Sequence, residues 1–281
     1  MRGALILAGW FFVVIIGLRA ELRPWLVETG VAWHDNVTNG ERRSDRLAAL
    51  EWQTRISRSV GRAFADGHRL GIGAGVRMEI WPRFAGLDVV VPEIAGRWEF
   101  KPGVGLHRPV FVAEVEGGWA AARESARGGF GGAGRLLVRQ RAGTAWWFSA
   151  GHEWRRFDAR GPAFARTARE WFGRAEWSAG ENWTVAVEGR ERQGDVVSYS
   201  RPPRPDLEAI GKPTTLVDTF EQDVPWIAYY FPAQTRSVAL EVRRSFGQMG
   251  LTLRHAYRDT LHAGPGYRNR RTELRLDWPF R

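Results

Sequence analysis

Arginine and glutamate are the residues of this 281-residue chain whose number and spacing could do chemistry. They recur at every second position of apolar segments, as in Glu153-Trp154-Arg155 and Glu188-Gly189-Arg190. Because successive side chains of a β-strand point to opposite faces, such a run places its charges on one face and its apolar side chains on the other. Charges that share a face can pair across neighbouring strands, or they can line a polar passage that selects solutes by charge.

Other chemistries find little support in the residue types. The chain contains no cysteine, so neither disulfide bonds nor thiolate metal sites can form. Its six histidines lack the spacing of metal ligands, and we expect no metal and no cofactor. The net charge is +10 and the isoelectric point is near 10.9, yet the arginines are interleaved with glutamate and not clustered. Nucleic acid is therefore not an expected partner.

A period of two dominates from Trp25 onward and predicts strands. The first strand begins at Trp25 and ends at Asp35-Asn36. Eleven more are expected at about residues 46–58, 70–80, 94–101, 110–120, 133–141, 144–156, 165–178, 183–192, 235–246, 249–259 and 269–280. The connections alternate between tight turns, such as Gly247-Gln248, and longer loops. The longest loop is Pro-rich and spans about residues 193–233.

Fifteen tryptophans are many for a soluble protein of this length. When the strands are drawn up and down in turn, aromatic side chains fall in two bands at the strand ends, as at the two interfaces of a membrane-spanning barrel. The aromatic residues expected at the interfaces are Trp25, Trp33, Trp81, Trp119, Trp146, Trp171, Trp177, Trp183, Trp278 and Phe280. A secreted soluble β-sandwich or barrel is the alternative, and it gives no reason for such bands.

The end of the chain carries the most specific pattern. Leu274, Leu276, Trp278 and Phe280 alternate with polar residues, and the apolar face becomes aromatic toward the end. This stretch resembles the C-terminal strand of bacterial outer-membrane β-barrel proteins. The resemblance implies an all-β, antiparallel up-and-down transmembrane β-barrel of about 12 strands, in contact with lipid in the bacterial outer membrane. It also implies that the barrel-assembly machinery recognises the strand from Arg271 to Phe280.

A second, shorter resemblance lies in the first strand. Val31-Ala32-Trp33-His34-Asp35-Asn36-Val37 is similar to a strand end in the barrel portion of surface-lipoprotein assembly modifiers. Those proteins carry helical repeats ahead of the barrel, and this sequence shows no helical period there.

The beginning of the chain is typical of a secretory signal peptide. Arg2 precedes an apolar run from Ala4 to Leu18, and the small residue Ala20 follows. We expect residues 1–20 to be the signal and residues 21–281 to form the barrel, with an uncleaved anchor as the alternative.

If the apolar face meets lipid, the charged face lines the lumen, because an arginine facing lipid at mid-depth costs about 2–4 kcal/mol. Gly71, Gly73 and Gly75 share this inward face. The charges expected at the lumen or its constriction are Arg55, Arg77, Glu79, Arg97, Glu99, Glu114, Arg155, Arg174, Arg190 and Arg254. Two roles fit them equally: they can pair and fill a closed lumen, or they can line a channel.

The function that we expect is a passive pore for small solutes or ions. The first alternative is a closed structural or secretion-assisting barrel whose loop at 193–233 docks a protein partner; the same loop could instead fold inward as a plug. The second is an outer-membrane lipid-modifying enzyme, for which His152 and His255 lie on apolar faces. No serine near them forms a recognisable motif, and Ser149 falls on the opposite face from His152.

Overall fold

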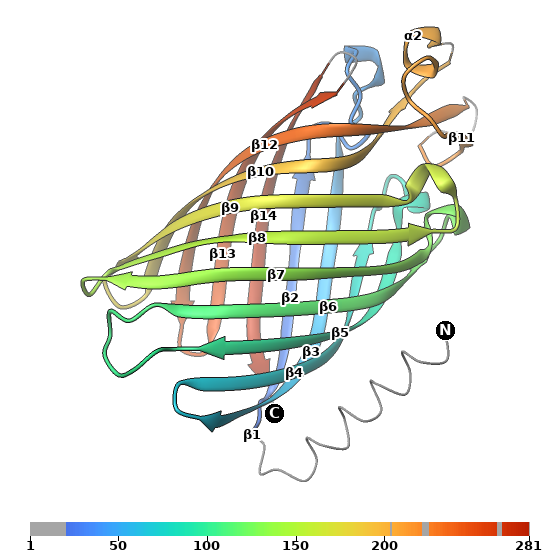
Figure 1. Ribbon diagram of the computed structural model, residues 1–281. Coiled ribbons are helices and arrows are strands. Elements are labelled where there is room, and N and C mark those ends of the chain that lie inside the picture. The colour runs from blue at the N-terminus through green and yellow to red at the C-terminus, as the bar shows by residue number, and fades with distance from the viewer. Residues whose placement is uncertain (1–20, 203, 221–224, 263–265, 281) are drawn as a thin grey trace.

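The computed structural model describes residues 21–202, 204–220, 225–262 and 266–280, and its main feature is a closed antiparallel barrel (Figure 1). Its twelve strands are β2 (Trp25–His34), β3 (Ala49–Ala65), β4 (His68–Ile80), β5 (Val89–Phe100), β6 (Val110–Ala122), β7 (Gly129–Ala142), β8 (Trp146–Ala159), β9 (Arg166–Ala179), β10 (Trp183–Ser200), β12 (Trp226–Phe246), β13 (Met249–His262) and β14 (Tyr267–Phe280). The predicted all-β, up-and-down barrel of about 12 strands is confirmed.

Closure occurs between the first and last barrel strands. β2 pairs with β3 on one side and with β14 on the other, with Trp25 opposite Phe280. Every barrel strand thus has two antiparallel neighbours. In hydrocarbon this matters because an open sheet edge leaves backbone groups unpaired, at a cost of several kcal/mol each.

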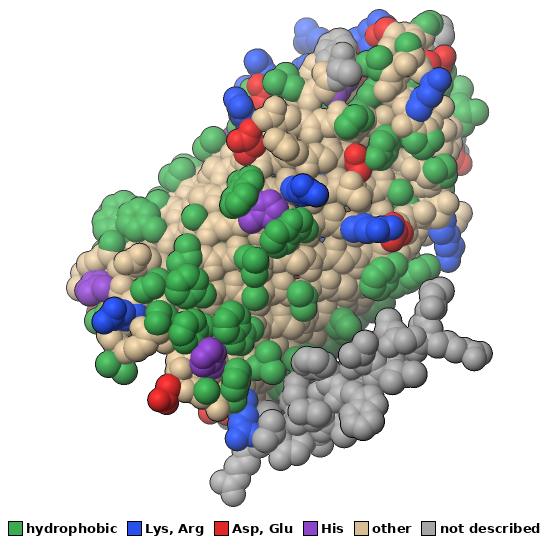
Figure 2. Space-filling model, in the orientation of Figure 1, with side chains coloured by type: hydrophobic (Ala, Val, Ile, Leu, Met, Phe, Trp, Pro, Cys, Tyr) green, Lys and Arg blue, Asp and Glu red, His purple; other side chains and the backbone are tan. Residues whose placement is uncertain are grey.

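The outer wall is apolar. Val76, Ile94 and Leu240 are 39%, 58% and 50% exposed, although they lie in the middle of their strands. In Figure 2 hydrophobic side chains spread over the wall, and charged ones gather mainly toward its ends. Water would disfavour such a surface, whereas lipid favours it, so the apolar face of each strand is the one that fits a membrane.

Tight turns join most strands at one end of the barrel, which we call the short-turn end, and only the β5–β6 connection of residues 101–109 is longer among the described connections there; both Trp25 and Phe280 lie at this end. Asp66-Gly67 joins β3 to β4 and Gly247-Gln248 joins β12 to β13. Both glycines have positive φ, 75° and 60°. A Cβ at Gly67 would also clash with the Lys101 carbonyl oxygen. Both the positive φ and this close approach therefore require glycine in the turn.

The opposite, long-loop end differs from the sequence prediction. β10 continues to Ser200 and β12 begins at Trp226, so the connection predicted at residues 193–233 is reduced to residues 201–225 (Figure 1). It contains the short helix α2 (Pro205–Glu208) and the strand β11 (Thr214–Val217), which pairs with β12. The sequence shows no apolar–polar alternation at residues 195–200, because this segment is buried on both faces and neighbouring side chains do not differ in exposure.

Glycine and proline concealed two other strand ends. β7 starts at Gly129 and β5 at Val89, where the sequence predicted loops at residues 128–132 and 82–93. A Cβ at Gly129 would lie 2.1 Å from the Asp158 carbonyl oxygen, so this glycine permits the close approach of β8.

Two further points concern the chain as a whole. Among the described residues no helix is long and apolar enough to cross a bilayer. The predicted signal at residues 1–20 lies outside the part that the structure describes. The two-residue strand β1 (Glu21–Leu22) follows it and pairs with β3.

Candidate functional site: a charged lumen beneath an aromatic cap

The ten charged residues predicted at the lumen all form ion pairs. Arg77 lies 3.0 Å from Glu79, and Arg97 lies 2.6 Å from Glu99 and also contacts Glu114. Arg55 bonds Glu93 at 2.5 Å. The other four predicted arginines pair with glutamates of their own strand or of the next strand but one: Arg155 with Glu153, Arg174 with Glu241, Arg190 with Glu188 and Arg254 with Glu188.

The densest network joins β9, β10, β12 and β13. The Glu188 carboxylate lies 2.7 Å from Arg190 Nε and 2.6 Å from Arg254 Nη2, and the residue is only 6% exposed. Arg190 also reaches Glu170 at 2.5 Å. Each charge is thus held by at least one opposite charge, as burial requires, and this side of the lumen is filled by a salt-bridge lattice.

Two cavities occupy the remaining lumen. The lower cavity, toward the short-turn end, has a volume of about 660 Å³, and the upper one, toward the long-loop end, about 700 Å³. Glu93, Glu116, Ala133 and Arg155 line both cavities, which therefore meet at their level. The predicted glycine stripe of β4 lines the lower cavity.

The two cavities differ in charge. Seven arginines and six glutamates line the lower cavity, so its charges nearly cancel. Nine arginines but only four glutamates line the upper cavity. Five of these arginines form no ion pair with any described carboxylate: Arg127, Arg166, Arg192, Arg258 and Arg270. Arg270 shares the outward alternation of Leu274 and Phe280 on β14, so the first four are the unpaired arginines of the inner side.

The sequence prediction missed these four. Arg192 follows Arg190 by two residues and Arg258 follows Arg254 by four, so the inward alternation could have found both. Arg127 lies in the short 3-10 helix between β6 and β7, which has no strand period, and Arg166 is the first residue of β9.

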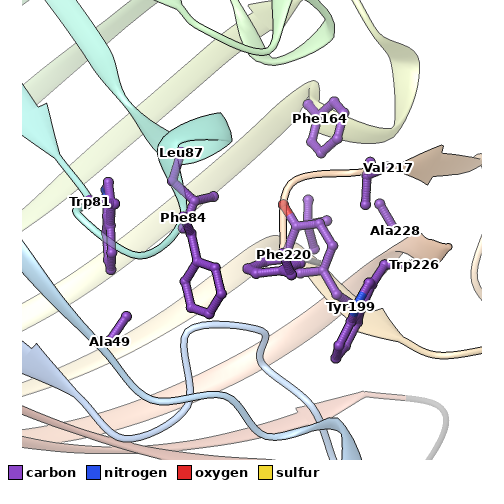
Figure 3. Packing of buried hydrophobic residues seen from close by; sticks show 11 residues of the cluster. Ala49, Trp81, Phe84, Leu87, Phe164, Tyr199, Val217, Phe220, Trp226 and Ala228 are labelled. Carbon is purple, nitrogen blue, oxygen red and sulfur yellow. The ribbon is translucent and has the colours of Figure 1, made fainter. Parts of the chain in front are cut away.

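Above the upper cavity, aromatic side chains from several connections form a cluster that we call the cap (Figure 3). The ring of Phe220 lies 5.2 Å from that of Phe84, 4.9 Å from that of Tyr199 and 5.3 Å from that of Trp226. Phe84 belongs to the β4–β5 connection and Trp226 to β12. The cap therefore links opposite walls, because five strands separate β5 from β12 in either direction around the barrel. Its buried members are Ala49, Trp81, Phe84, Leu87, Phe164, Val197, Tyr199, Val217, Phe220, Trp226 and Ala228.

The cap is attached through the end of β10. The last residue of β10 that pairs with β9 is Gly194, opposite Ala168. Beyond it, the freed edge bonds the β2–β3 connection: Tyr199 N donates to the Thr38 carbonyl oxygen at 2.8 Å, and Asn39 Nδ2 donates to that of Val197 at 2.8 Å. The β10–β12 extension is thereby fastened across the mouth of the barrel.

A charged cluster lies on the outer side of this extension. Arg204 is 2% exposed, and its guanidinium lies 2.7 Å from Asp206, 3.0 Å from Glu41 and 3.3 Å from Asp45. The hydrogen bond from Arg204 lowers the pKa of the Asp206 carboxyl to about 2. This cluster ties α2 to the β2–β3 connection. None of the described residues of 201–225 lines either cavity, so this part of the connection covers the mouth and does not plug the lumen.

Nine of the ten predicted interface aromatics lie on the outer face, and one does not. Eight are more than a third exposed, and Trp278, which alternates with the exposed Leu274 and Phe280, is half-buried. Trp81 is a correction: it is 8% exposed, belongs to the cap and lies 4.9 Å from the His34 ring. The exposed Ile80 precedes it, so alternation turns Trp81 inward. Contact of the other nine with the membrane interface stays a prediction.

The histidines considered for lipid chemistry have no serine partner among the described residues. The His152 ring lies on the outer wall, 4.3 Å from Trp154 and 4.3 Å from Trp171. His255 Nδ1 lies 2.9 Å from Thr272 Oγ1. In the described part of the chain neither histidine hydrogen-bonds a serine, and no group of residues could hold a metal ion.

Comparison with solved structures identifies the fold. A crystal structure of an outer-membrane channel from Pseudomonas putida F1 superposes with a TM-score of 0.61 at 10% identity, covering 92% of this chain and 96% of that one. The NanC porin (TM-score 0.44, 8% identity, 91% and 100% covered) and the translocator domain of the autotransporter NalP from Neisseria meningitidis (0.40, 10%, 99% and 96%) are more distant. No family model and no curated protein sequence matches the chain.

The chain thus has the fold of bacterial outer-membrane β-barrel proteins, and this agrees with its apolar wall and the predicted location in the outer membrane.

Proposed function

We propose that this barrel is a passive channel for small solutes or ions, with a lumen lined by arginine and glutamate. The observation that carries the proposal is the pair of polar cavities, about 660 and 700 Å³, that meet at Glu93, Glu116 and Arg155. Solutes pass this level, and the charges there act on them at short range. The outer-membrane channel from Pseudomonas putida F1, which has a similar fold, supports the proposal at the level of the fold alone.

In this proposal the ten predicted lumen charges have two tasks. The paired network around Glu188 holds the wall together, because each buried charge has an opposite partner. Arg77 and Arg97 are 47% and 49% exposed to the lumen, so they retain contact with solvent and act on passing ions.

Conductance of the refolded chain in planar bilayers tests the channel. We expect discrete openings whose cation-to-anion permeability ratio rises in Arg77→Ala and Arg97→Ala, because each removes a positive charge from the lumen. Arg123→Ala is the matched control, since Arg123 is 69% exposed and lies in the β6–β7 connection. Equal ratios in all variants would contradict the proposal.

The cap favours one alternative, a closed structural or secretion-assisting barrel that docks a partner at the connection of residues 201–225. The cap joins opposite walls over the mouth of the barrel, and α2 lies outside the cap. Bilayers that stay silent even after the cap is weakened support this alternative and refute the channel. Release of fatty acid from phospholipid micelles would instead support a lipid-modifying enzyme.

We also propose that the barrel-assembly machinery recognises β14, which supplies one side of the closing seam with β2. Leu274 and Phe280 are 45% and 41% exposed on the outer wall. Phe280→Ala should slow assembly by the purified machinery but not spontaneous insertion into lipid vesicles; equal slowing in both would refute recognition.

A further inference from the structure

Arg258 is unpaired because its cross-strand neighbours are neutral. On β13, Arg254 has Glu241 and Glu273 opposite it in the two adjacent strands. Arg258, four residues further along the same face, has Ser237 and Asn269 there instead. The charge is retained while its partners are replaced by neutral residues. Arg192 does have Glu170 opposite it on β9, but that carboxylate pairs with Arg190 at 2.5 Å. With nine arginines and four glutamates in its lining, the upper cavity therefore carries an excess of positive charge.

The charges of this cavity also act on one another. Arg166 experiences the charges of Arg127 and Arg192, and Arg258 experiences those of Arg192 and Arg271. Like charges that share a confined space repel each other, and an anion between them removes that repulsion and gains charge-assisted hydrogen bonds.

The roof of the cavity adds an apolar surface. Tyr199, Phe164 and Trp81 line it from the cap. Arg127 connects roof and wall: its Nη1 donates to the Tyr199 hydroxyl at 2.5 Å, and its guanidinium lies 5.4 Å from the Phe164 ring centre. The volume of about 700 Å³ lies within the range of about 300–1,000 Å³ that is typical of small-molecule sites.

We propose that the upper cavity binds a small organic anion, a carboxylate on an apolar or aromatic body. The carboxylate lies among Arg166, Arg192 and Arg258, and the apolar body lies against Tyr199 and Phe164. This inference rests on the proposed channel and names its solute class. The upper cavity would then be a solute-binding site above the level where the two cavities meet.

Equilibrium binding to the refolded full chain in detergent tests the site without any need for conduction. The probe is benzoate at low salt, followed by ligand-observed NMR, with benzamide as its neutral isostere and inorganic phosphate as an anion without an apolar body. We expect benzoate to bind at least tenfold more tightly than benzamide or phosphate. Arg192→Gln and Arg258→Gln should each weaken benzoate binding about five- to tenfold, whereas Arg123→Gln should not.

The outcomes separate the two proposals. Benzoate binding with bilayers that stay silent even after the cap is weakened refutes the channel but keeps the site, and conduction without benzoate binding refutes the site but keeps the channel. Phosphate binding as tight as benzoate binding overturns the apolar part. Binding that is equal in the wild type and in the arginine variants overturns the location. Arg166→Gln is a third variant, so the test stands if one of the others does not fold.

Discussion

Replacing Phe220 by alanine should open the mouth of the barrel. The Phe220 ring is 5% exposed and contacts three aromatic rings of the cap at 4.9 to 5.3 Å. Truncation of a buried phenylalanine costs about 3–5 kcal/mol in a packed core. We take about 3 kcal/mol, the lower end, because a water-accessible cavity lies directly beneath the cap.

This cost falls on the closed state alone, because Phe220 loses its contacts when the cap separates. Since each 1.4 kcal/mol is a factor of ten, about 3 kcal/mol raises the ratio of open to closed channels about 100-fold. The assay is the open probability of single channels in planar bilayers at fixed voltage. Phe84→Ala removes the same contact from the opposite wall and should act in the same direction. The double variant should open less than the product of the two single effects, because both remove one shared contact.

The matched control is Leu216→Ala, four residues earlier. Leu216 is also apolar but is 69% exposed on β11, so its truncation should leave the open probability within about threefold of the wild type. An open probability of folded Phe220→Ala within that same range would refute the role of the cap as a gate. Folding of each variant is checked by its heat-dependent migration on gels.

Three further predictions concern the wall and the outer cluster. Glu188→Gln should lower the free energy of unfolding in lipid by about 1–3 kcal/mol in a urea titration, because Arg254 loses its charged partner and Arg190 keeps only Glu170; an unchanged midpoint would mean that the network adds no stability. Val76→Arg should lower that free energy by about 2–4 kcal/mol because the charge faces lipid, whereas Gly71→Arg on the inward face of the same strand should cost less; equal costs would reverse our assignment of the two faces. Arg204 lowers the pKa of Asp206 to about 2, so their bond is complete above about pH 4 and is lost as the pH falls through about 2. Hydrogen exchange of the α2 amides, corrected for intrinsic rates, should therefore be constant from pH 7 to 5 and should rise at pH 7 in Asp206→Asn; no rise there would contradict the bond.

The barrel wall was predictable from the sequence because its two faces meet different media. The lipid-facing side accepts apolar side chains such as Val76 and Ile94 but excludes charged ones. Successive residues along each strand therefore alternate between apolar types that face lipid and polar types that face the lumen. The number of strands follows from that alternation, and the proposed inward placement of the ten charges rests on it as well.

The cap was not predictable because this contrast is absent there. Val196 and Val197 are both buried, one against Leu207 and Tyr229 and the other within the cap, so neighbouring residues no longer differ. The alternation of β4 places Trp81 on the inward face, next to the outward-facing Ile80. The prediction placed it at the membrane interface because tryptophan is common there. Nothing in the local sequence shows that Phe84 and Phe220 meet, since their contact depends on how two distant connections fold over the mouth.

The cap and the unpaired arginines have one physical consequence together. A cavity with more positive than negative charge attracts anions, and a cover above it retards their exchange with the outside. An anion that binds only beneath the closed cap stabilises the closed state by mass action, whereas one that leaves lets the cap open at lower cost. Benzoate should therefore reduce the open probability of the wild type more than that of Phe220→Ala, whose cap is already weakened. Equal reduction in both would mean that the anion blocks the lumen by itself and that the cavity and the cap act independently.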